Sequence, residues 1–188
     1  MNDNFKKQIE SIDDLSEIAT IISNSTELHE SVSLYSNDPF ESLYKNGNGK
    51  VPMGFKKKGD TIYLIGDYNG TEDDNSSVVE VIVDAVERGL LESAHALGKG
   101  GLFIGLVESC SVNRLGFDIT SDAELSDKNF LFNGGNQAIL VSVSNEKESG
   151  FVDYIYNNGI RIILLGHVTK GEFRLDDLSF GFIHDYIG

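Results

Sequence analysis

Hydrophobic residues recur at three- and four-residue spacing along the first part of the chain, from Phe5 to Ile22. This spacing places them on one face of a helix, so the pattern predicts an amphipathic helix over residues 4–23. Apolar and polar residues then alternate over His29–Tyr35, which predicts a strand. Residues 37–50 are rich in Asn and Gly and contain a proline, so a loop is predicted there.

From Gly59 onward, strand-like and helix-like patterns alternate to the end of the chain. Strands are predicted at Ile62–Ile65, Ser93–Leu97, Gly116–Thr120, Ala138–Val143 and Ile160–Val168. Helices are predicted from a capping box at Ser77 to Gly89, from Gly101 to Cys110, from Asn145 to Asn158 and, in the tail, over Leu175–Ile187. This alternation predicts an α+β fold with a mixed sheet flanked by helices, partly ferredoxin-like.

The break in this pattern near residue 50 predicts a division of the chain into two parts. Residues 1–50 form a small N-terminal piece made of one helix and one strand, and residues 51–188 form the main domain. A chain of 188 residues, with 40% hydrophobic and 24% charged residues, suits one globular domain with an appendage of this kind.

Composition and charge exclude several classes of protein. The chain has 30 acidic and 15 basic residues, and its net charge of −15 would repel nucleic-acid phosphates. No apolar run approaches the roughly 18 residues of a membrane span, and the N-terminus lacks a signal peptide, so we expect a cytoplasmic protein without membrane contact. The single cysteine, Cys110, excludes an internal disulfide and a cysteine zinc cluster. The four histidines are scattered, so no metal site is expected from them.

Residues 93–102, Ser-Ala-His-Ala-Leu-Gly-Lys-Gly-Gly-Leu, connect a predicted strand to a predicted helix. A turn of this kind places free backbone N–H groups at a helix N-terminus, where the helix dipole also favours an anion. The candidate ligand-binding residues of this turn are His95, Gly98, Lys99, Gly100 and Gly101.

The same run resembles Ser-Ala-His-Asp-x-Ser-(Asp/Glu)-Gly-Gly-Leu in the C-terminal domain of the phosphoribosylformylglycinamidine synthase family. Further segments are similar to the family in the same order and at similar spacing: Glu30–Tyr35, Gly59–Gly66, Leu131–Phe132 followed by Ala138–Val143, and Gly166–Val168. The resemblance covers nearly the whole chain. It implies a fold similar to the C-terminal domain of aminoimidazole ribonucleotide synthetase.

The resemblance also implies a family of enzymes that couple ATP hydrolysis to the amidation of formylglycinamide ribonucleotide, with Mg²⁺ and with ammonia from glutamine. It implies that the chain begins at the last helix of the nucleotide-binding domain. The family's ATP site, catalytic histidine and most metal ligands would then belong to a missing nucleotide-binding half. Ser33 matches a serine that contacts substrate in the family, so it is a further candidate ligand-binding residue.

Several other positions depart from the functional pattern of the family. Ala96 and Lys99 stand where the family carries carboxylates, Gly134 and Ala138 replace a glutamate and an arginine, and Glu30 replaces a glycine. Magnesium prefers hard oxygen ligands, and one unit charge at about 4 Å is worth roughly 4 kcal/mol at an effective dielectric near 20, so a lysine would oppose the ion. We therefore expect no catalytic residue, no metal site and no cofactor in this chain alone. A structural role is favoured for His95.

Two hypotheses of different classes follow from these observations. In the first, the chain is a catalytically incomplete C-terminal domain of a synthase-like protein. In the second, it is a divergent, non-catalytic binding or assembly module. Such a module would use the predicted strand at residues 29–35 to pair with another copy or with the missing half, since an unpaired strand edge seeks a partner. It could also bind a small phosphate compound through Lys99 and the neighbouring glycines.

Overall fold

The computed structural model of the protein describes residues 3–37, 51–68, 76–98, 100–132 and 138–188. Its centre is a seven-stranded sheet in the order β2-β4-β1-β5-β3-β6-β7. The strands are β1 (Thr61–Ile65), β2 (Ser93–Ala96), β3 (Gly116–Ile119), β4 (Ile139–Val143), β5 (Ile162–Thr169), β6 (Glu172–Leu175) and β7 (Leu178–Phe182). The β3–β6 pair is parallel and the other neighbours are antiparallel. The predicted α+β fold with a mixed sheet is therefore confirmed.

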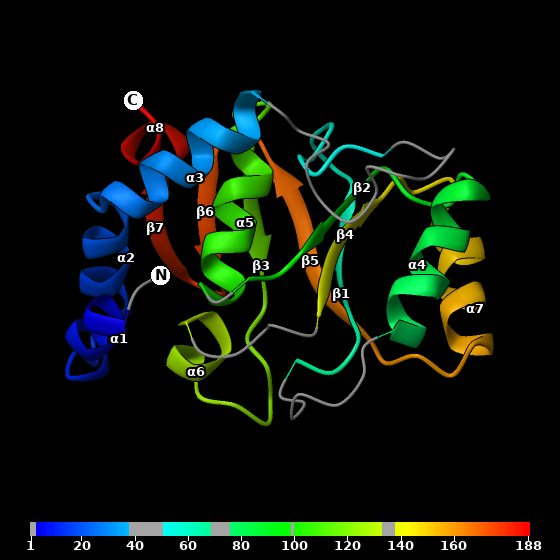
Figure 1. Cartoon of the computed structure of the whole chain (residues 1–188), viewed down its shortest axis with the longest axis horizontal. Coiled ribbons are helices and arrows are strands. Elements are labelled where there is room, and N and C mark those ends of the chain that lie inside the picture. The colour runs from blue at the N-terminus through cyan, green and yellow to red at the C-terminus, as the bar shows by residue number, and fades with distance from the viewer. Residues whose placement is uncertain (1–2, 38–50, 69–75, 99, 133–137) are drawn as a thin grey trace.

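Helices pack on both faces of this sheet (Figure 1). They are α1 (Asp3–Glu10), α2 (Leu15–Ser23), α3 (Thr26–Asn37), α4 (Ser76–Glu87), α5 (Gly101–Ser111), α6 (Asp127–Phe132), α7 (Glu148–Asn157) and α8 (Ile183–Tyr186). Strand β1 shows how one strand serves two cores. Its residues Ile62 and Leu64 face the core under α5, whereas Tyr63 and Ile65 face the core under α4 and α7. Period-two alternation in a fully buried strand produces this division.

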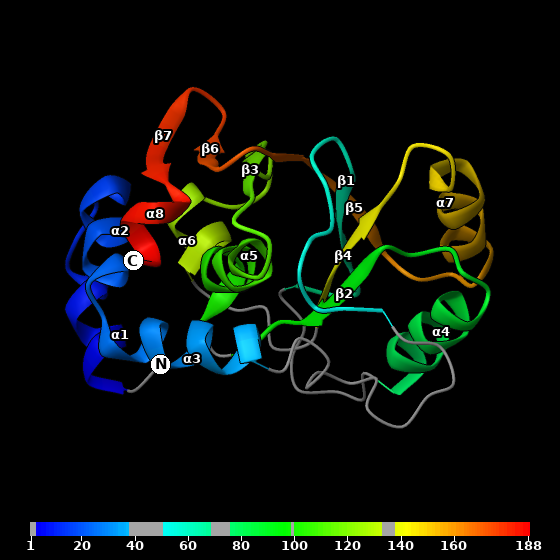
Figure 2. The same cartoon turned by 90° about the horizontal axis from the view of Figure 1, so that it is seen from above.

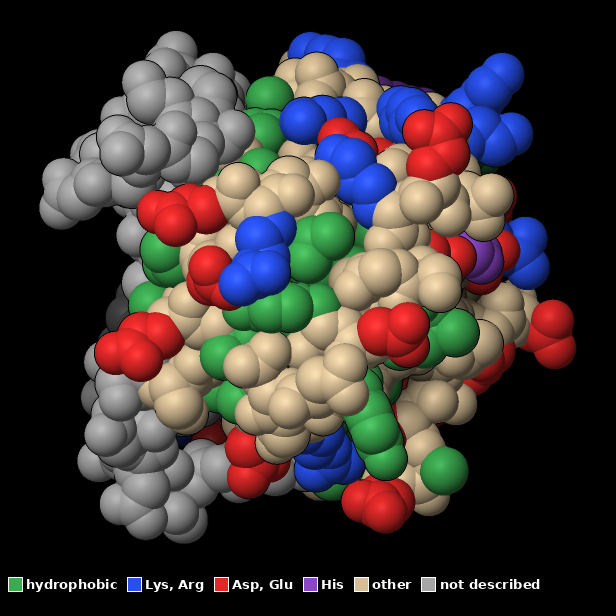
Figure 3. Space-filling view, turned by 90° about the vertical axis from the view of Figure 1, so that its right-hand side faces the viewer, with side chains coloured by type: hydrophobic (Ala, Val, Ile, Leu, Met, Phe, Trp, Pro, Cys, Tyr) green, Lys and Arg blue, Asp and Glu red, His purple; other side chains and the backbone are tan. Residues whose placement is uncertain are grey.

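The two faces of the sheet are covered unequally, as Figure 2 shows from above. Helices α4 and α7 share their core with β2, β4 and β1, while the core on the other face extends from α5 to β3, β6 and β7. The side of the molecule formed by α4 and α7 has hydrophobic side chains between scattered charges (Figure 3), because several valines of α4 are only partly buried.

The N-terminal segment differs from the sequence prediction in two ways. The predicted helix over residues 4–23 is two helices, because the Asp14 side chain accepts a hydrogen bond from the Glu17 N–H at 2.9 Å and starts α2 as a new helix. The predicted strand at His29–Tyr35 is wrong, since these residues belong to α3. Leu28 and Val32 are buried four residues apart in the core of α2, and this contact favours the helix over the strand.

The predicted helix over Leu175–Ile187 is also wrong. Residues in this range form the end of β6, the whole of β7 and the short helix α8. Asp176 has φ of 50°, the left-handed conformation that a two-residue hairpin turn requires and that Asp adopts more readily than most residues. The turn places Leu175 and Phe180 in the core, so tertiary packing outweighs the helical spacing of the tail.

The predicted boundary near residue 50 lies beside residues 38–50, which are outside the described part of the chain. The described N-terminal helices nevertheless share one core with the rest of the protein, because Ile18, Ile22 and Leu28 pack in the same cluster as α5 and β3. Because the boundary itself lies outside the described residues, the division into residues 1–50 and 51–188 stays a prediction. None of the helices in the described residues is long and apolar enough to cross a bilayer.

Candidate functional site

The candidate site is the turn between β2 and α5. Four of the six predicted ligand-binding residues are described residues at this turn: His95, Gly98, Gly100 and Gly101. The register places Ala96 of β2 beside Ile139 of β4, and Ile139 also pairs with Ile65 of β1. The turn therefore lies at the end of the sheet where β1 finishes. Lys99 lies outside the described residues, so its role as a phosphate ligand stays a prediction.

The His95 side chain points into the protein beneath α5. It is 3% exposed, and its Nε2 lies 2.8 Å from Oε2 of Glu108 on α5. The other carboxylate oxygen of Glu108 accepts a hydrogen bond from the Ser31 hydroxyl on α3. The buried His95 and Glu108 and the half-buried Ser31 form a polar network that joins β2, α5 and α3. A buried carboxylate needs hydrogen-bond partners of this kind.

Ser33 is on the same helix as Ser31 but has an exposed side chain. The structure thus brings Ser31, and not Ser33, to the Glu108 carboxylate that also contacts the buried histidine. The ligand-binding role of Ser33, which was inferred from its match to a substrate-contacting serine, stays a prediction.

Two glycines of this region allow close packing of α5. Gly101 has φ of +76°, and a Cβ at this position would lie 3.0 Å from the carbonyl oxygen of Leu131 in α6. A Cβ at Gly105 would lie 2.3 Å from the Leu97 side chain. Gly98, by contrast, is exposed and has no atom within 4 Å of where its Cβ would stand. Gly101 is therefore required by packing, whereas Gly98 is open to solvent.

The N-terminus of α5 is partly occupied by a tyrosine. The N-cap, Gly100, has no side chain to accept from the first turn of the helix. The hydroxyl of Tyr68, which follows β1, lies near the Leu102 backbone amide and donates a hydrogen bond to the Phe130 carbonyl. Burial raises the pKa of Tyr68, so this hydroxyl keeps its proton. The tyrosine hydroxyl therefore stands beside one amide that an anion could use.

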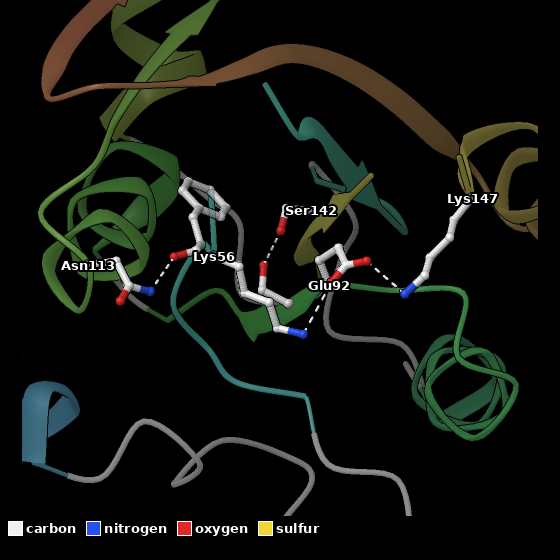
Figure 4. Close-up of polar contacts among 7 residues, drawn as sticks. Lys56, Glu92, Asn113, Ser142 and Lys147 are labelled. Carbon is white, nitrogen blue, oxygen red and sulfur yellow. Dashed lines mark hydrogen bonds and ion pairs between the residues drawn. The ribbon is translucent and has the colours of Figure 1, made fainter. Parts of the chain in front are cut away.

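A second polar cluster lies at the other end of β2 (Figure 4). Glu92 bridges two lysines, with its carboxylate 3.1 Å from Lys56 Nζ and 2.7 Å from Lys147 Nζ. Burial alone would raise the pKa of Glu92, but the hydrogen bonds from Lys147 and Lys56 outweigh it and lower that pKa. The Ser93 and Ser142 hydroxyls, 2.5 Å apart, link β2 to β4 beside this cluster.

Asp60 is the other carboxyl group at this end of the sheet. It is 1% exposed, and its Oδ2 has no hydrogen-bond partner within the described part of the chain. Burial raises the pKa of Asp60; the nearby charge of Glu92 acts in the same direction, and that of Lys57 opposes them. This carboxyl group therefore carries an electrostatic penalty when it is charged.

The sequence analysis missed Glu108, Ser31 and Tyr68 as partners of the turn. Glu108 had a signal, because it is a single carboxylate in an otherwise apolar helix and such a group needs a partner. Ser31 and Tyr68 gave no such signal, since they reach the turn from α3 and from the end of β1.

Comparison with known proteins identifies relatives of this chain. It is 38% identical to the phosphoribosylformylglycinamidine synthase subunit PurL of Leuconostoc mesenteroides over 140 residues, which make up 63% of this chain and 18% of the relative. It is 30% identical to the same subunit of Carboxydothermus hydrogenoformans over 150 residues, or 68% of this chain and 21% of the relative. The chain thus spans about a fifth of the length of these curated relatives. No protein-family model matches it.

Solved structures show the same relationship at the level of the fold. Thermotoga maritima PurL complexed with ATP is similar with a TM-score of 0.60 and 18% identity, over 68% of this chain and 24% of that one. A chain of PurLQS from the same organism is similar with a TM-score of 0.57 and 18% identity, over 65% of this chain and 24% of that one. The resemblance inferred from the sequence motifs is confirmed: the chain is a homologue of part of the PurL subunit of phosphoribosylformylglycinamidine synthase.

Proposed function

We propose that this chain acts as a catalytically incomplete C-terminal domain of a PurL-like protein of purine biosynthesis. Its similarity to a fifth of the PurL subunit supports the family assignment. The turn between β2 and α5 carries the proposal of incompleteness, because residues 93–102 contain no carboxylate. Mg²⁺ bound with a nucleotide phosphate needs such oxygen ligands.

The position of His95 supports the same proposal. Its imidazole contacts the buried Glu108 carboxylate and lies beneath α5. The network with Ser31 gives this histidine a structural task, which is to join the N-terminal helices to β2. We infer that the chain keeps the fold of the family although it lacks the catalytic groups.

An activity assay tests the proposal directly. The isolated chain is incubated with formylglycinamide ribonucleotide, ATP, Mg²⁺ and ammonia, and ADP release is measured. We expect no ADP above the level found without the ribonucleotide. Release of ADP that depends on the ribonucleotide would overturn the proposal.

ATP and Mg²⁺ would belong to the nucleotide-binding half in this account, and that half is the expected partner. A similar solved chain comes from the assembly named PurLQS, and the matched region is a quarter or less of PurL. We expect the chain to co-purify with a PurL fragment that lacks the matched region. Failure of the two to associate at micromolar concentration would contradict this partnership.

A second candidate function is the binding of a small phosphate compound at the same turn. The open position of Gly98 and the bare N-cap at Gly100 favour it, whereas the Tyr68 hydroxyl near the Leu102 amide opposes it. Ligand at a hundred times its dissociation constant stabilises a protein by roughly 2.7 kcal/mol, which a thermal-shift assay detects. A melting-temperature rise with millimolar phosphate that Lys99→Ala abolishes would establish this candidate. No shift would remove it.

A further inference from the structure

One face of the sheet is only half covered by helices. On the side of α4 and α7, the core includes β2, β4, β1 and the first residue of β5, and none of the described helices lies over β3, β6 or β7 (Figure 1 and Figure 2). Leu164 shows the change along the sheet. It pairs with the buried Tyr63 and is on the same face, yet it is 57% exposed.

The uncovered residues on this side form a surface that we name the open face. It consists of Leu164, His167, Asp118, Arg174, Glu172 and Phe182. Phe182 pairs with Glu172 at the edge of the sheet and is 48% exposed. Leu164 and Phe182 are two of the four large hydrophobic side chains that are exposed in the described residues. Leu164 on β5 and Phe182 on β7 flank the polar side chains of β3 and β6 that lie between them.

Charged side chains alternate across the middle of the open face. The strand register aligns His167 of β5, Asp118 of β3 and Arg174 of β6 in one row. The Arg174 guanidinium lies 3.9 Å from the Glu172 carboxylate, which is long for a hydrogen bond. Its Nε is buried and has no hydrogen-bond partner within the described part of the chain. The Arg174 side chain as a whole is 37% exposed, so its terminal nitrogens can donate hydrogen bonds to a further carboxylate.

We propose that the open face is an interface between two copies of this chain, related by a two-fold axis that runs parallel to the strands between β3 and β6. Such an axis brings β3 of one protomer opposite β6 of its partner. Arg174 of each copy then faces Asp118 of the partner subunit, because these two residues are register neighbours on adjacent strands. An isologous interface needs a self-complementary patch of this kind.

The local charge balance of the open face allows a second copy to bind there despite the net charge of the chain. The chain carries a net charge of −15, so two copies repel each other unless the contact surface is nearly balanced. The open face has two carboxylates, one arginine and one histidine, and its acidic surplus is therefore small.

The size of the open face sets the expected strength of the contact. Four strands about 4.8 Å apart and about five residues long cover roughly 19 Å by 17 Å. This is less than the roughly 800 Å² per partner of a standard interface, so we expect a weak dimer that forms as concentration rises.

Charge reversal in two separate chains tests the proposal. Sedimentation velocity at about 0.15 M salt, where the Debye length is about 8 Å, screens the net charge. We expect the mean mass of the wild-type protein to rise towards twice the monomer mass with concentration. Arg174→Asp and Asp118→Arg should each remain monomeric, because like charges then face each other. An equimolar mixture of the two variants should form dimers again.

The mixture distinguishes the contact between chains from effects within one chain. Each variant has like charges at positions 118 and 174 of its own sheet, so only pairing with the other variant restores opposite charges. Phe182→Ser should weaken the dimer at least tenfold, and Tyr156→Ser, which removes a 77% exposed ring on α7 away from the open face, should leave it unchanged. Thermal melts verify that each variant folds, and Leu164→Ser replaces any variant that does not. A strictly monomeric wild-type protein, a dimer that the variants leave intact, or a mixture that stays monomeric would each overturn the proposal.

Discussion

Buried polar side chains at the two ends of β2 carry most of the specific chemistry of this protein at the scale of single residues. His95, Glu108 and Ser31 satisfy one another beneath α5, whereas Asp60 at the opposite end of the sheet keeps an unpaired carboxylate oxygen within the described part of the chain. A satisfied network stabilises a fold and an unsatisfied charge weakens it. Substitution in the His95 network should therefore destabilise the protein, whereas substitution of Asp60 should stabilise it.

Glu108→Ala should lower the free energy of unfolding by about 3 kcal/mol, because it removes the carboxylate that the buried His95 and the half-buried Ser31 share. Urea denaturation measures this change. Glu87→Ala, which removes an exposed carboxylate from α4, is the matched control and should change stability by less than about 0.5 kcal/mol. Equal effects of the two substitutions would show that the network contributes nothing.

Asp60→Asn should make the protein more stable at neutral pH. Burial raises the pKa of Asp60 in the folded state, so the folded protein holds this proton more tightly than the unfolded chain. Stability is then highest below the ordinary carboxyl pKa and falls as pH rises through the folded pKa. The advantage of Asp60→Asn should accordingly shrink as pH falls from 7 towards about 4. Denaturation curves of both proteins across this range check the sign, and a less stable variant at pH 7 would contradict it.

The partners of His95 could not be predicted from the sequence. Ser31 precedes Glu108 by 77 residues, and their contact depends on how α3 packs across α5. The motif at residues 93–102 identified the turn itself, since its glycines and its histidine are adjacent in the chain. Local motifs are visible in a sequence, but contacts made by tertiary packing are not.

At the scale of elements, the predictions from β1 to β5 were largely correct, whereas those for the N-terminal segment and the tail were not. The predicted strands and helices match the elements from β1 to β5, apart from the six-residue helix α6, which is too short to show a period. In α3, Val32 suits a strand when read with Leu34 and a helix when read with Leu28, and burial against α2 decides for the helix. The tail has helical spacing, but the left-handed turn at Asp176 makes it a hairpin.

Close packing of α5 predicts different costs for two glycines of one turn. Gly101→Ala should destabilise the protein by about 1–2 kcal/mol or more, because a left-handed conformation is strained in an L-residue and the methyl group meets the Leu131 carbonyl. Gly98→Ala should change stability by less than about 0.5 kcal/mol, because its surroundings are open. Thermal melts compare the two variants. Equal losses would contradict the packing of α5 against α6.

At the scale of the whole molecule, the N-terminal helices belong to the same hydrophobic core as the sheet. Ile18, Ile22, Leu28 and Val32 are all buried in the cluster that contains α5. Full burial of such a side chain is worth about 1.5–3 kcal/mol, and a domain is stable by about 5–15 kcal/mol in total. Their loss would remove a large share of the stability.

A fragment of residues 51–188 should therefore lack a cooperative thermal transition, or melt far below the full chain. Circular dichroism during heating measures this difference. A fragment with an unchanged melting temperature would instead support two independent parts divided near residue 50.

We propose that the chain keeps the fold of a PurL region without the groups that hold the metal-bound nucleotide. Calorimetric titration of the full chain with ATP and Mg²⁺ tests it most directly, with a complete PurL subunit as the positive control. The account predicts only heat of dilution for this chain. Saturable heat with a dissociation constant below about 1 mM, which corresponds to about −4.1 kcal/mol of binding free energy, would contradict it.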